Sequence, residues 1–143
     1  MRVVSNDAYP EERDALSRDW PEYLSRIFPE VILVPLLNQP NAVVPLIKSL
    51  KLHGIILSGG NGLFRFPLRD ATEKNILTYA MAHALPVLGV CRGFQFLNVF
   101  FGGTLEKGIH KKSFEDHGNT IHSVQLEDGK NLRVNSFHKQ GVM

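Results

Sequence analysis

The chain has 143 residues, of which 43% are hydrophobic and 21% charged, and its formal net charge is +2. This composition is typical of a single globular domain and excludes a disordered chain or a basic nucleic-acid-binding surface. The single cysteine excludes an internal disulfide, and no apolar run approaches the roughly 20 residues that span a bilayer. We therefore expect a cytoplasmic protein with no nucleic-acid or membrane partner.

Helices and strands are predicted to alternate over the first 90 residues. Apolar residues at helical spacing predict an amphipathic helix over residues 12–28. Either this helix kinks at Pro21, or a second helix begins with Pro21 in its first turn. The β-branched run 31–34 predicts a buried strand. The pattern then predicts a helix over 42–52 with Pro45 in its first turn, a strand over 54–57, a helix over 73–84 and a strand over 86–90.

The last third of the chain has a different pattern. An apolar run after Cys91 predicts a helix that ends near Phe101, and short strands are then expected at 104–107, 121–126 and 132–136. The turn sequence Glu127-Asp128-Gly129-Lys130 predicts a hairpin between the last two strands. The fold class that results is α/β, with an open, mostly parallel sheet, helices on both faces and a β-hairpin appendage.

Cys91 lies in the middle of a Gly-x-Cys-x-Gly sequence between the predicted strand 86–90 and the helix that follows. A sharp strand-to-helix turn of this kind exposes a nucleophile at the end of a parallel strand. Glycine at 89 and 93 suits the strained, closely packed backbone of such a turn, and the partial positive charge of the helix N-terminus favours the thiolate. The alternative is a buried structural cysteine.

A second glycine-rich turn, Ser58-Gly59-Gly60, follows the predicted strand 54–57. Sites in open α/β sheets lie beyond the C-terminal ends of the strands. If the two strands are adjacent, the backbone N–H groups of Gly60 and Arg92 would surround one carbonyl oxygen as an oxyanion hole. The alternative is a merely flexible glycine turn.

The segment Gly-Val-Cys-Arg-Gly-Phe-Gln resembles the nucleophile motif of class I glutamine amidotransferases, and in particular of their γ-glutamyl hydrolase branch, peptidase family C26. Three further segments are similar to that branch: 55–61, 69–73 and 134–140. The opening segment 9–20 resembles a subgroup found with bacterial surface-polysaccharide genes. The resemblance implies a flavodoxin-like fold and a hydrolase that cleaves a γ-glutamyl amide through a Cys91 thioester, without a cofactor. A γ-glutamyl–nucleotide conjugate in capsule synthesis is a candidate substrate, and free glutamine is another.

The resemblance also implies contacts to the glutamyl group. It assigns Gln95 to the glutamyl moiety, Gly59 to the substrate-binding turn, and the segment with Ser136, Phe137 and His138 to the α-amino and α-carboxylate groups. His138 is also an alternative candidate for the catalytic base. Gly62 stands where this group often has an aspartate, so no carboxylate role is carried over to that position.

One family feature is missing from the sequence. The resemblance implies a triad completed by a His-x-Glu motif near the C-terminus, and no His-x-Glu occurs in this chain. The first four residues also make only half of a first strand. We therefore expect a single but incomplete domain over 1–143, truncated at the C-terminus and clipped at the N-terminus. A catalytically inactive remnant or γ-glutamyl-binding module is the alternative function.

Several polar residues have structural interpretations. Asp70 and Glu73 form the pattern of a helix capping box. Arg69 faces either substrate or solvent, and the Arg92 guanidinium is either near the site or in a salt bridge. His110, His117 and His122, with Glu115 and Asp116, match no zinc-binding spacing, so we expect no metal site.

Overall fold

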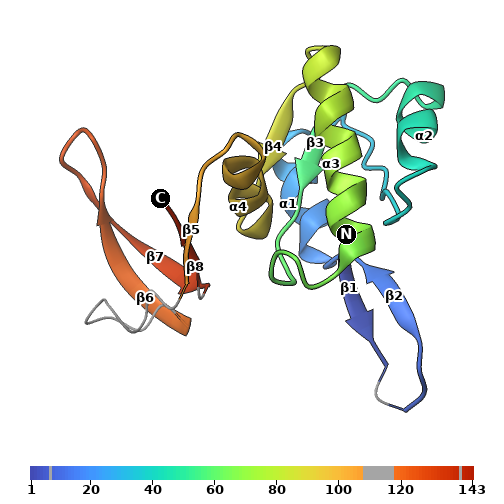
Figure 1. Cartoon of the computed structure of the whole chain (residues 1–143). Coiled ribbons are helices and arrows are strands. Elements are labelled where there is room, and N and C mark those ends of the chain that lie inside the picture. The colour runs from blue at the N-terminus through green and yellow to red at the C-terminus, as the bar shows by residue number, and fades with distance from the viewer. Residues whose placement is uncertain (7, 108–117, 139) are drawn as a thin grey trace. The chain divides into compact units, whose positions relative to one another are not determined.

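The structure, a computed structural model, describes residues 1–6, 8–107, 118–138 and 140–143. These residues form two compact units, unit 1 (Met1–Phe96) and unit 2 (Leu97–Met143). Within the described residues there are four helices and eight strands (Figure 1). The strands pair into four two-stranded sheets, of which β3–β4 is parallel and the other three are antiparallel. The chain is thus mixed α/β, and the predicted parallel sheet is confirmed only in this one pair.

Unit 1 begins with an antiparallel pair that the sequence did not predict. β1 (Arg2–Ser5) pairs with β2 (Glu12–Ala15), and α1 (Asp19–Ile27) follows with Pro21 in its first turn. The predicted helical start at residue 12 is therefore wrong, whereas a helix with Pro21 in its first turn is confirmed. The carboxylate of Asp14 accepts hydrogen bonds from the backbone N–H (2.8 Å) and the side-chain amide of Asn38. Such long-range bonds override the helical propensity of residues 12–15.

The predicted strand at 31–34 is also wrong. The structure has no strand there, and Val31 and Ile32 are 59% and 87% exposed. A strand forms only where a neighbouring strand offers backbone partners. Among the described residues, β3 pairs with β4 alone, so the β-branched run has no strand partner.

The core of unit 1 is formed by two helices and the parallel pair. α2 (Val43–Ser49) packs against α3 (Pro67–Ala82), and β3 (Ile55–Leu57) pairs with β4 (Val87–Gly89). Their most buried apolar side chains are those of Val43, Ile47, Ile55, Leu57, Ile76, Leu77 and Ala80. These elements confirm the predicted helix with Pro45 in its first turn and both predicted strands, each a little shorter than expected.

Helix α3 begins six residues earlier than predicted. Pro67 is its first residue, where the fixed φ of proline suits a helix start, and Phe66 precedes it without a side-chain cap. The prediction that Asp70 caps the helix with Glu73 is therefore wrong. Both carboxylates instead bind arginines that the local pattern could not identify as their partners.

Unit 2 contains the predicted hairpin. β6 (Gly118–Gln125) and β7 (Asn131–Phe137) pair in antiparallel register, and Gly129 adopts a φ of 82° in the turn between them. β5 (Leu105–Lys107) pairs with β8 (Gln140–Val142), a strand that was not predicted. The boundary between the units falls within α4 (Arg92–Phe100).

Candidate active site

The backbone around Cys91 forms the sharp strand-to-helix turn that the sequence predicts. Cys91 stands between β4 and α4 with a φ of 54°, and its side chain is exposed. Few residues other than glycine adopt this left-handed conformation, because it brings Cβ close to the following carbonyl oxygen. Cys91 is therefore a strained, accessible residue at the tip of the turn, as a nucleophile requires.

Gly93 allows this turn to pack against the preceding strand. A Cβ atom at this position would lie 2.0 Å from the carbonyl oxygen of Leu57, the last residue of β3. The Gly93 N–H donates to the carbonyl of Val90 (2.9 Å), and the Gln95 N–H donates to that of Cys91 (3.1 Å), so the first turn of α4 forms directly after the cysteine. Sequence reasoning anticipated the glycine for this reason.

The turn after β3 lies beside the cysteine. A Cβ atom built on Gly59 would be 3.3 Å from the Cβ of Cys91 and 3.7 Å from its Sγ. Gly60 follows with a φ of 119°, which L-residues rarely adopt. The structure thus brings together Gly59, Gly60, Cys91 and Arg92 at the ends of two adjacent parallel strands, as predicted. Gln95, one helical turn after Cys91, is 9% exposed.

Four charged side chains lie behind these two turns. Arg69, Glu73 and Arg92 are almost completely buried, and the Asp70 side chain is 16% exposed. Glu73 accepts from the Nε of Arg69 (2.9 Å) through one oxygen and from Arg92 through the other, while Arg92 also binds Asp70. The Arg92 guanidinium thus forms salt bridges, which decides between the two predicted positions for it, and the Arg69 side chain does not face solvent.

Arg69 also holds the glycine turn directly. Its Nη2 donates to the carbonyl oxygens of Ser58 (2.8 Å) and Gly59 (3.1 Å), and its Nη1 donates to the side chain of Asn61 (3.2 Å). Burial, followed by the positive charge of Arg92, keeps the pKa of Arg69 below its ordinary value, while Glu73 acts in the opposite direction. Sequence reasoning missed this role, and its only signal was the Arg-Asp-x-x-Glu segment that resembles the family.

Asn61 connects the glycine turn to the first strand. Its Oδ1 accepts from the backbone N–H of Val3 (2.7 Å), and its Nδ2 donates to the Val3 carbonyl (2.9 Å). The side-chain amide of Asn61 therefore binds the backbone N–H and C=O of Val3 in the way that a residue of a neighbouring strand would. The turn is consequently fixed from two directions, by Arg69 and by β1.

The remaining predicted substrate contacts lie in unit 2. Ser136 and Phe137 end β7, the former buried and the latter 75% exposed. His138 follows, partly buried, with its Nδ1 3.1 Å from the carbonyl oxygen of Gln140. Cys91, Gly59, Gly60, Arg92 and Gln95 all belong to unit 1.

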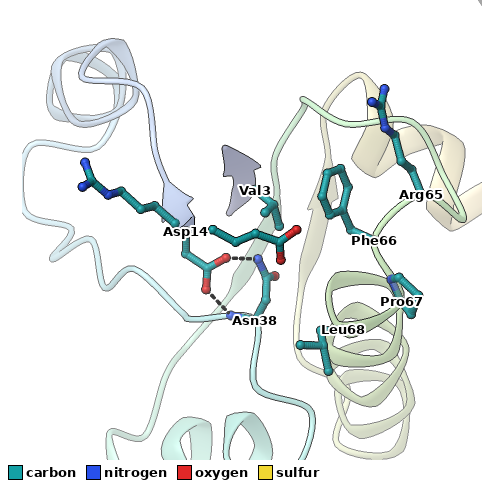
Figure 2. Close-up of a pocket in the computed structure, with 9 residues that line it drawn as sticks. Val3, Asp14, Asn38, Arg65, Phe66, Pro67 and Leu68 are labelled. Carbon is teal, nitrogen blue, oxygen red and sulfur yellow. Dashed lines mark hydrogen bonds between the residues drawn. The ribbon is translucent and has the colours of Figure 1, made fainter. Parts of the chain in front are cut away.

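A cavity of about 430 Å³ in unit 1 is distinct from these residues. Figure 2 shows the Asp14–Asn38 hydrogen bonds on one side of it and Phe66, Pro67 and Leu68 at the start of α3 on the other. None of the predicted site residues lines it. Asp14 and Asn38 bind one another, and the other polar side chains that line the cavity are those of Glu12, Arg13 and Arg65.

The described residues contain neither a cluster of metal ligands nor a helix that could cross a membrane. No three His, Cys, Asp or Glu side chains in that part of the chain are grouped as metal ligands. His110, Glu115, Asp116 and His117 of the considered cluster lie outside the described residues. In the same part of the chain, no helix combines the length and apolar character needed to cross a membrane.

Comparison with known proteins identifies the family. The sequence model of the peptidase C26 family matches residues 3–143. A Schizosaccharomyces pombe protein, provisionally named as a glutamine amidotransferase, is 31% identical over 134 residues, covering 73% of this chain and 51% of that protein. The gamma-glutamyl-CDP-amidate hydrolase of Campylobacter jejuni is 31% identical over 142 residues, covering 89% of this chain and 70% of the hydrolase.

The gamma-glutamyl-gamma-aminobutyrate hydrolase of Escherichia coli is 27% identical over 144 residues, covering 85% of this chain and 54% of that enzyme. The chain thus spans about half the length of the yeast and E. coli relatives. The family match covers almost every residue described above, including both glycine turns and Cys91. The chain belongs to the peptidase C26 family.

Proposed function

We propose that this chain carries the nucleophile and oxyanion hole of a glutamine amidotransferase-like hydrolase that cleaves a γ-glutamyl amide bond. The observation that carries the proposal is the exposed Cys91, held at a φ of 54° in the β4–α4 turn with Gly59 against its side chain. Membership of peptidase family C26 supports the same chemistry.

The reaction would proceed through a thioester. The Cys91 thiolate attacks the γ-carbonyl carbon, and a C–S bond forms as the carbonyl electrons move to oxygen. The N–H groups of Gly60 and Arg92 stabilise this oxyanion, each by about 3 kcal/mol. The oxyanion then collapses, the C–N bond breaks, and the amine leaves with a proton that an imidazolium donates to its nitrogen. The resulting imidazole accepts a proton from water as the water attacks the thioester, and glutamate is released with regeneration of the thiolate.

The names of the bacterial relatives support recognition of a γ-glutamyl group. The Campylobacter and E. coli hydrolases share that half of their named substrates and differ in the leaving group. We assign the γ-glutamyl group of this chain's substrate to Gly59, Gln95, Ser136, Phe137 and His138. A γ-glutamyl–nucleotide conjugate of capsule synthesis, processed in the cytoplasm, is the candidate substrate. For the fold, we infer that β3 and β4 are the central pair of a larger flavodoxin-like parallel sheet.

The nucleophile assignment is tested by covalent labelling. A diazo-ketone analogue of glutamine should alkylate Cys91 alone, and millimolar glutamine should slow the labelling, as followed by intact-protein and peptide mass spectrometry. The Cys91→Ser protein is the control and should remain unlabelled. Labelling that glutamine does not slow, or no labelling of the folded protein, would contradict a formed γ-glutamyl pocket.

The base is tested separately, because the sequence contains no His-x-Glu. Hydrolysis needs an imidazole close to the sulfur for both proton transfers. We expect this chain to turn over glutamine slowly or not at all, even where Cys91 is labelled. Rapid turnover that His138→Ala abolishes would instead identify His138 as the base. Labelling with glutamine protection but no turnover would identify a γ-glutamyl-binding module.

A further inference from the structure

The side chains of Arg69, Asp70, Glu73 and Arg92 form a network of ion pairs next to the two turns. Arg69 and Arg92 balance Glu73 and Asp70, and three of the four are less than 5% exposed. A buried ion network of this kind is often no more stabilising than apolar side chains of the same volume. The hydrogen bonds that the network makes, rather than its contribution to the free energy of folding, therefore indicate its role.

Arg69 fixes the direction of the backbone in the glycine turn. It donates to two successive carbonyl oxygens, those of Ser58 and Gly59. None of the described peptide bonds is cis, and in a trans peptide the C=O and the following N–H point in opposite directions. Because the Gly59 carbonyl points toward Arg69, the Gly60 N–H must point away from it. The same holds for the Ser58 carbonyl and the Gly59 N–H.

A peptide flanked by two glycines would not hold this direction unaided. Glycine has the widest range of allowed backbone conformations, and Gly60 already has a φ of 119°. Without Arg69, the peptide between Gly59 and Gly60 could rotate and turn its N–H toward the protein interior. The Asn61–Val3 bonds fix the next residue but not this peptide.

Glu73 connects this constraint to the cysteine turn. One of its oxygens accepts from Arg69 and the other from Arg92, whose own N–H is the second proposed oxyanion donor. A single buried carboxylate therefore fixes both turns relative to one another. Asp70 adds a second bond to Arg92 from the same helix.

We propose that Arg69 is a positioning residue that orients the Gly59–Gly60 peptide so that the Gly60 N–H stabilises the oxyanion. Glu73 in turn fixes the Arg69 guanidinium through its hydrogen bond to Nε. This inference rests on the proposed function, since the oxyanion arises only if Cys91 attacks a carbonyl. Arg69 itself does not touch the substrate. The variants Arg69→Lys, which keeps the charge, and Arg69→Met, which keeps the volume, both remove the paired bonds to the carbonyls.

The first test compares two reactions of Cys91. Acylation by the γ-(4-nitrophenyl) ester of glutamate forms an oxyanion and releases nitrophenolate, whereas alkylation by iodoacetamide displaces iodide and forms none. With the Cys91→Ala protein as the blank, Arg69→Lys and Arg69→Met should slow acylation about 100-fold, the effect of losing one oxyanion donor. Alkylation should change less than about twofold. Arg26→Lys, in the exposed Arg26–Glu22 pair, is the matched control and should alter neither rate.

The second test does not depend on activity. Residual dipolar couplings report the orientation of each N–H bond, and those of Gly59 and Gly60 should change in the Arg69 variants while those of α2 do not. Unchanged dipolar couplings of Gly59 and Gly60 in the Arg69 variants would overturn the proposal. Acylation and alkylation rates that fall by the same factor would also overturn it, as would an Arg69→Lys protein that fails to fold. If the parent chain shows no acylation at all, the proposed function fails, and the couplings alone decide whether Arg69 orients the turn.

Discussion

At Gly93 the first turn of α4 packs directly on the end of β3. A Cβ atom there would lie 2.0 Å from the carbonyl oxygen of Leu57 and 2.6 Å from its carbonyl carbon. Both are backbone atoms, so a change of rotamer cannot relieve the contact. The turn that exposes Cys91 therefore requires the absence of a side chain two residues later.

Gly93→Ala should accordingly destabilise the chain by about 2–3 kcal/mol, because the helix must move away from the strand. Urea unfolding followed by circular dichroism measures this change. Gly62→Ala is the matched control, since a Cβ there meets nothing within 4 Å, and its effect should stay within about 0.5 kcal/mol. Equal stabilities of the two variants would contradict the close packing at Gly93.

The strained backbone at Cys91 gives a second prediction at the residue scale. Left-handed backbone costs an L-residue roughly 1–2 kcal/mol and costs glycine almost nothing. Cys91→Gly should therefore be about 1 kcal/mol more stable than Cys91→Ala, although both lack the thiol. The two free energies of unfolding provide the comparison. An alanine variant as stable as the glycine variant would show that the turn relaxes when the cysteine is removed.

At the scale of the element, α3 contributes to both the candidate site and the core. Its first two turns carry Arg69, Asp70 and Glu73, and its later turns carry the apolar Ile76, Leu77 and Ala80. The beginning of the helix thus fixes the two turns of the candidate site, and the rest of it fills the core. A change in the beginning should affect both stability and site geometry.

Glu73→Ala should show this effect on stability. Removing the shared carboxylate leaves two buried guanidinium groups with only Asp70 as a charged partner, and such a loss typically costs 3–5 kcal/mol, about ten times that of an exposed pair. Glu22→Ala, which removes an exposed i,i+4 partner of Arg26, should cost less than about 0.5 kcal/mol. Thermal and urea unfolding measure both. A Glu73→Ala protein as stable as the control would contradict the paired-charge assignment.

The elements that the sequence predicted best are those encoded by neighbouring residues. The Gly-x-Cys-x-Gly turn and the turn at Glu127–Lys130 were both anticipated, because their backbone conformations depend on glycines at fixed positions. The adjacency of the turns after β3 and β4 was also anticipated, from the general placement of sites in parallel sheets.

The elements that the sequence did not predict depend on distant partners. Residues 12–15 contain good helix formers but pair with β1, and Asp70 and Glu73 match a capping box but bind Arg92, which lies 22 and 19 residues away. The run 31–34 is apolar enough for a strand but has no strand partner in the described structure. A pattern of neighbouring residues does not identify the distant residue with which a strand pairs or a charged side chain forms a salt bridge.

At the scale of the whole molecule, the apolar core is unevenly distributed. Every buried hydrophobic side chain among the described residues belongs to unit 1, from Val3 to Phe96. Among the residues of unit 2 whose exposure is described, 97–106, 120–138 and 140–143, Ser136 is the only buried one. The strands of unit 2 are thus held mainly by their backbone ladders, with little burial of apolar surface to stabilise them.

Hydrogen exchange should reflect this difference. We expect slow exchange for the amides of β3 and β4 and fast exchange for those of β6, β7 and β8, since opening free energies follow local burial. Exchange of the intact chain followed by NMR, or by mass spectrometry after proteolysis, measures both sets at once. Protection of β7 equal to that of β3 would contradict the expected order of stabilities.

The shared carboxylate of Glu73 also limits how this sequence can diverge. Any single replacement that removes the charge of Arg69, Glu73 or Arg92 leaves an opposite charge buried with fewer partners, at a large cost to folding. A lineage can therefore abandon the network only through compensating changes that occur nearly together. In evolutionary terms, the codons of Arg69, Glu73 and Arg92 are therefore kept or lost together. The exposed pair of Glu22 and Arg26 in α1 can instead change one residue at a time.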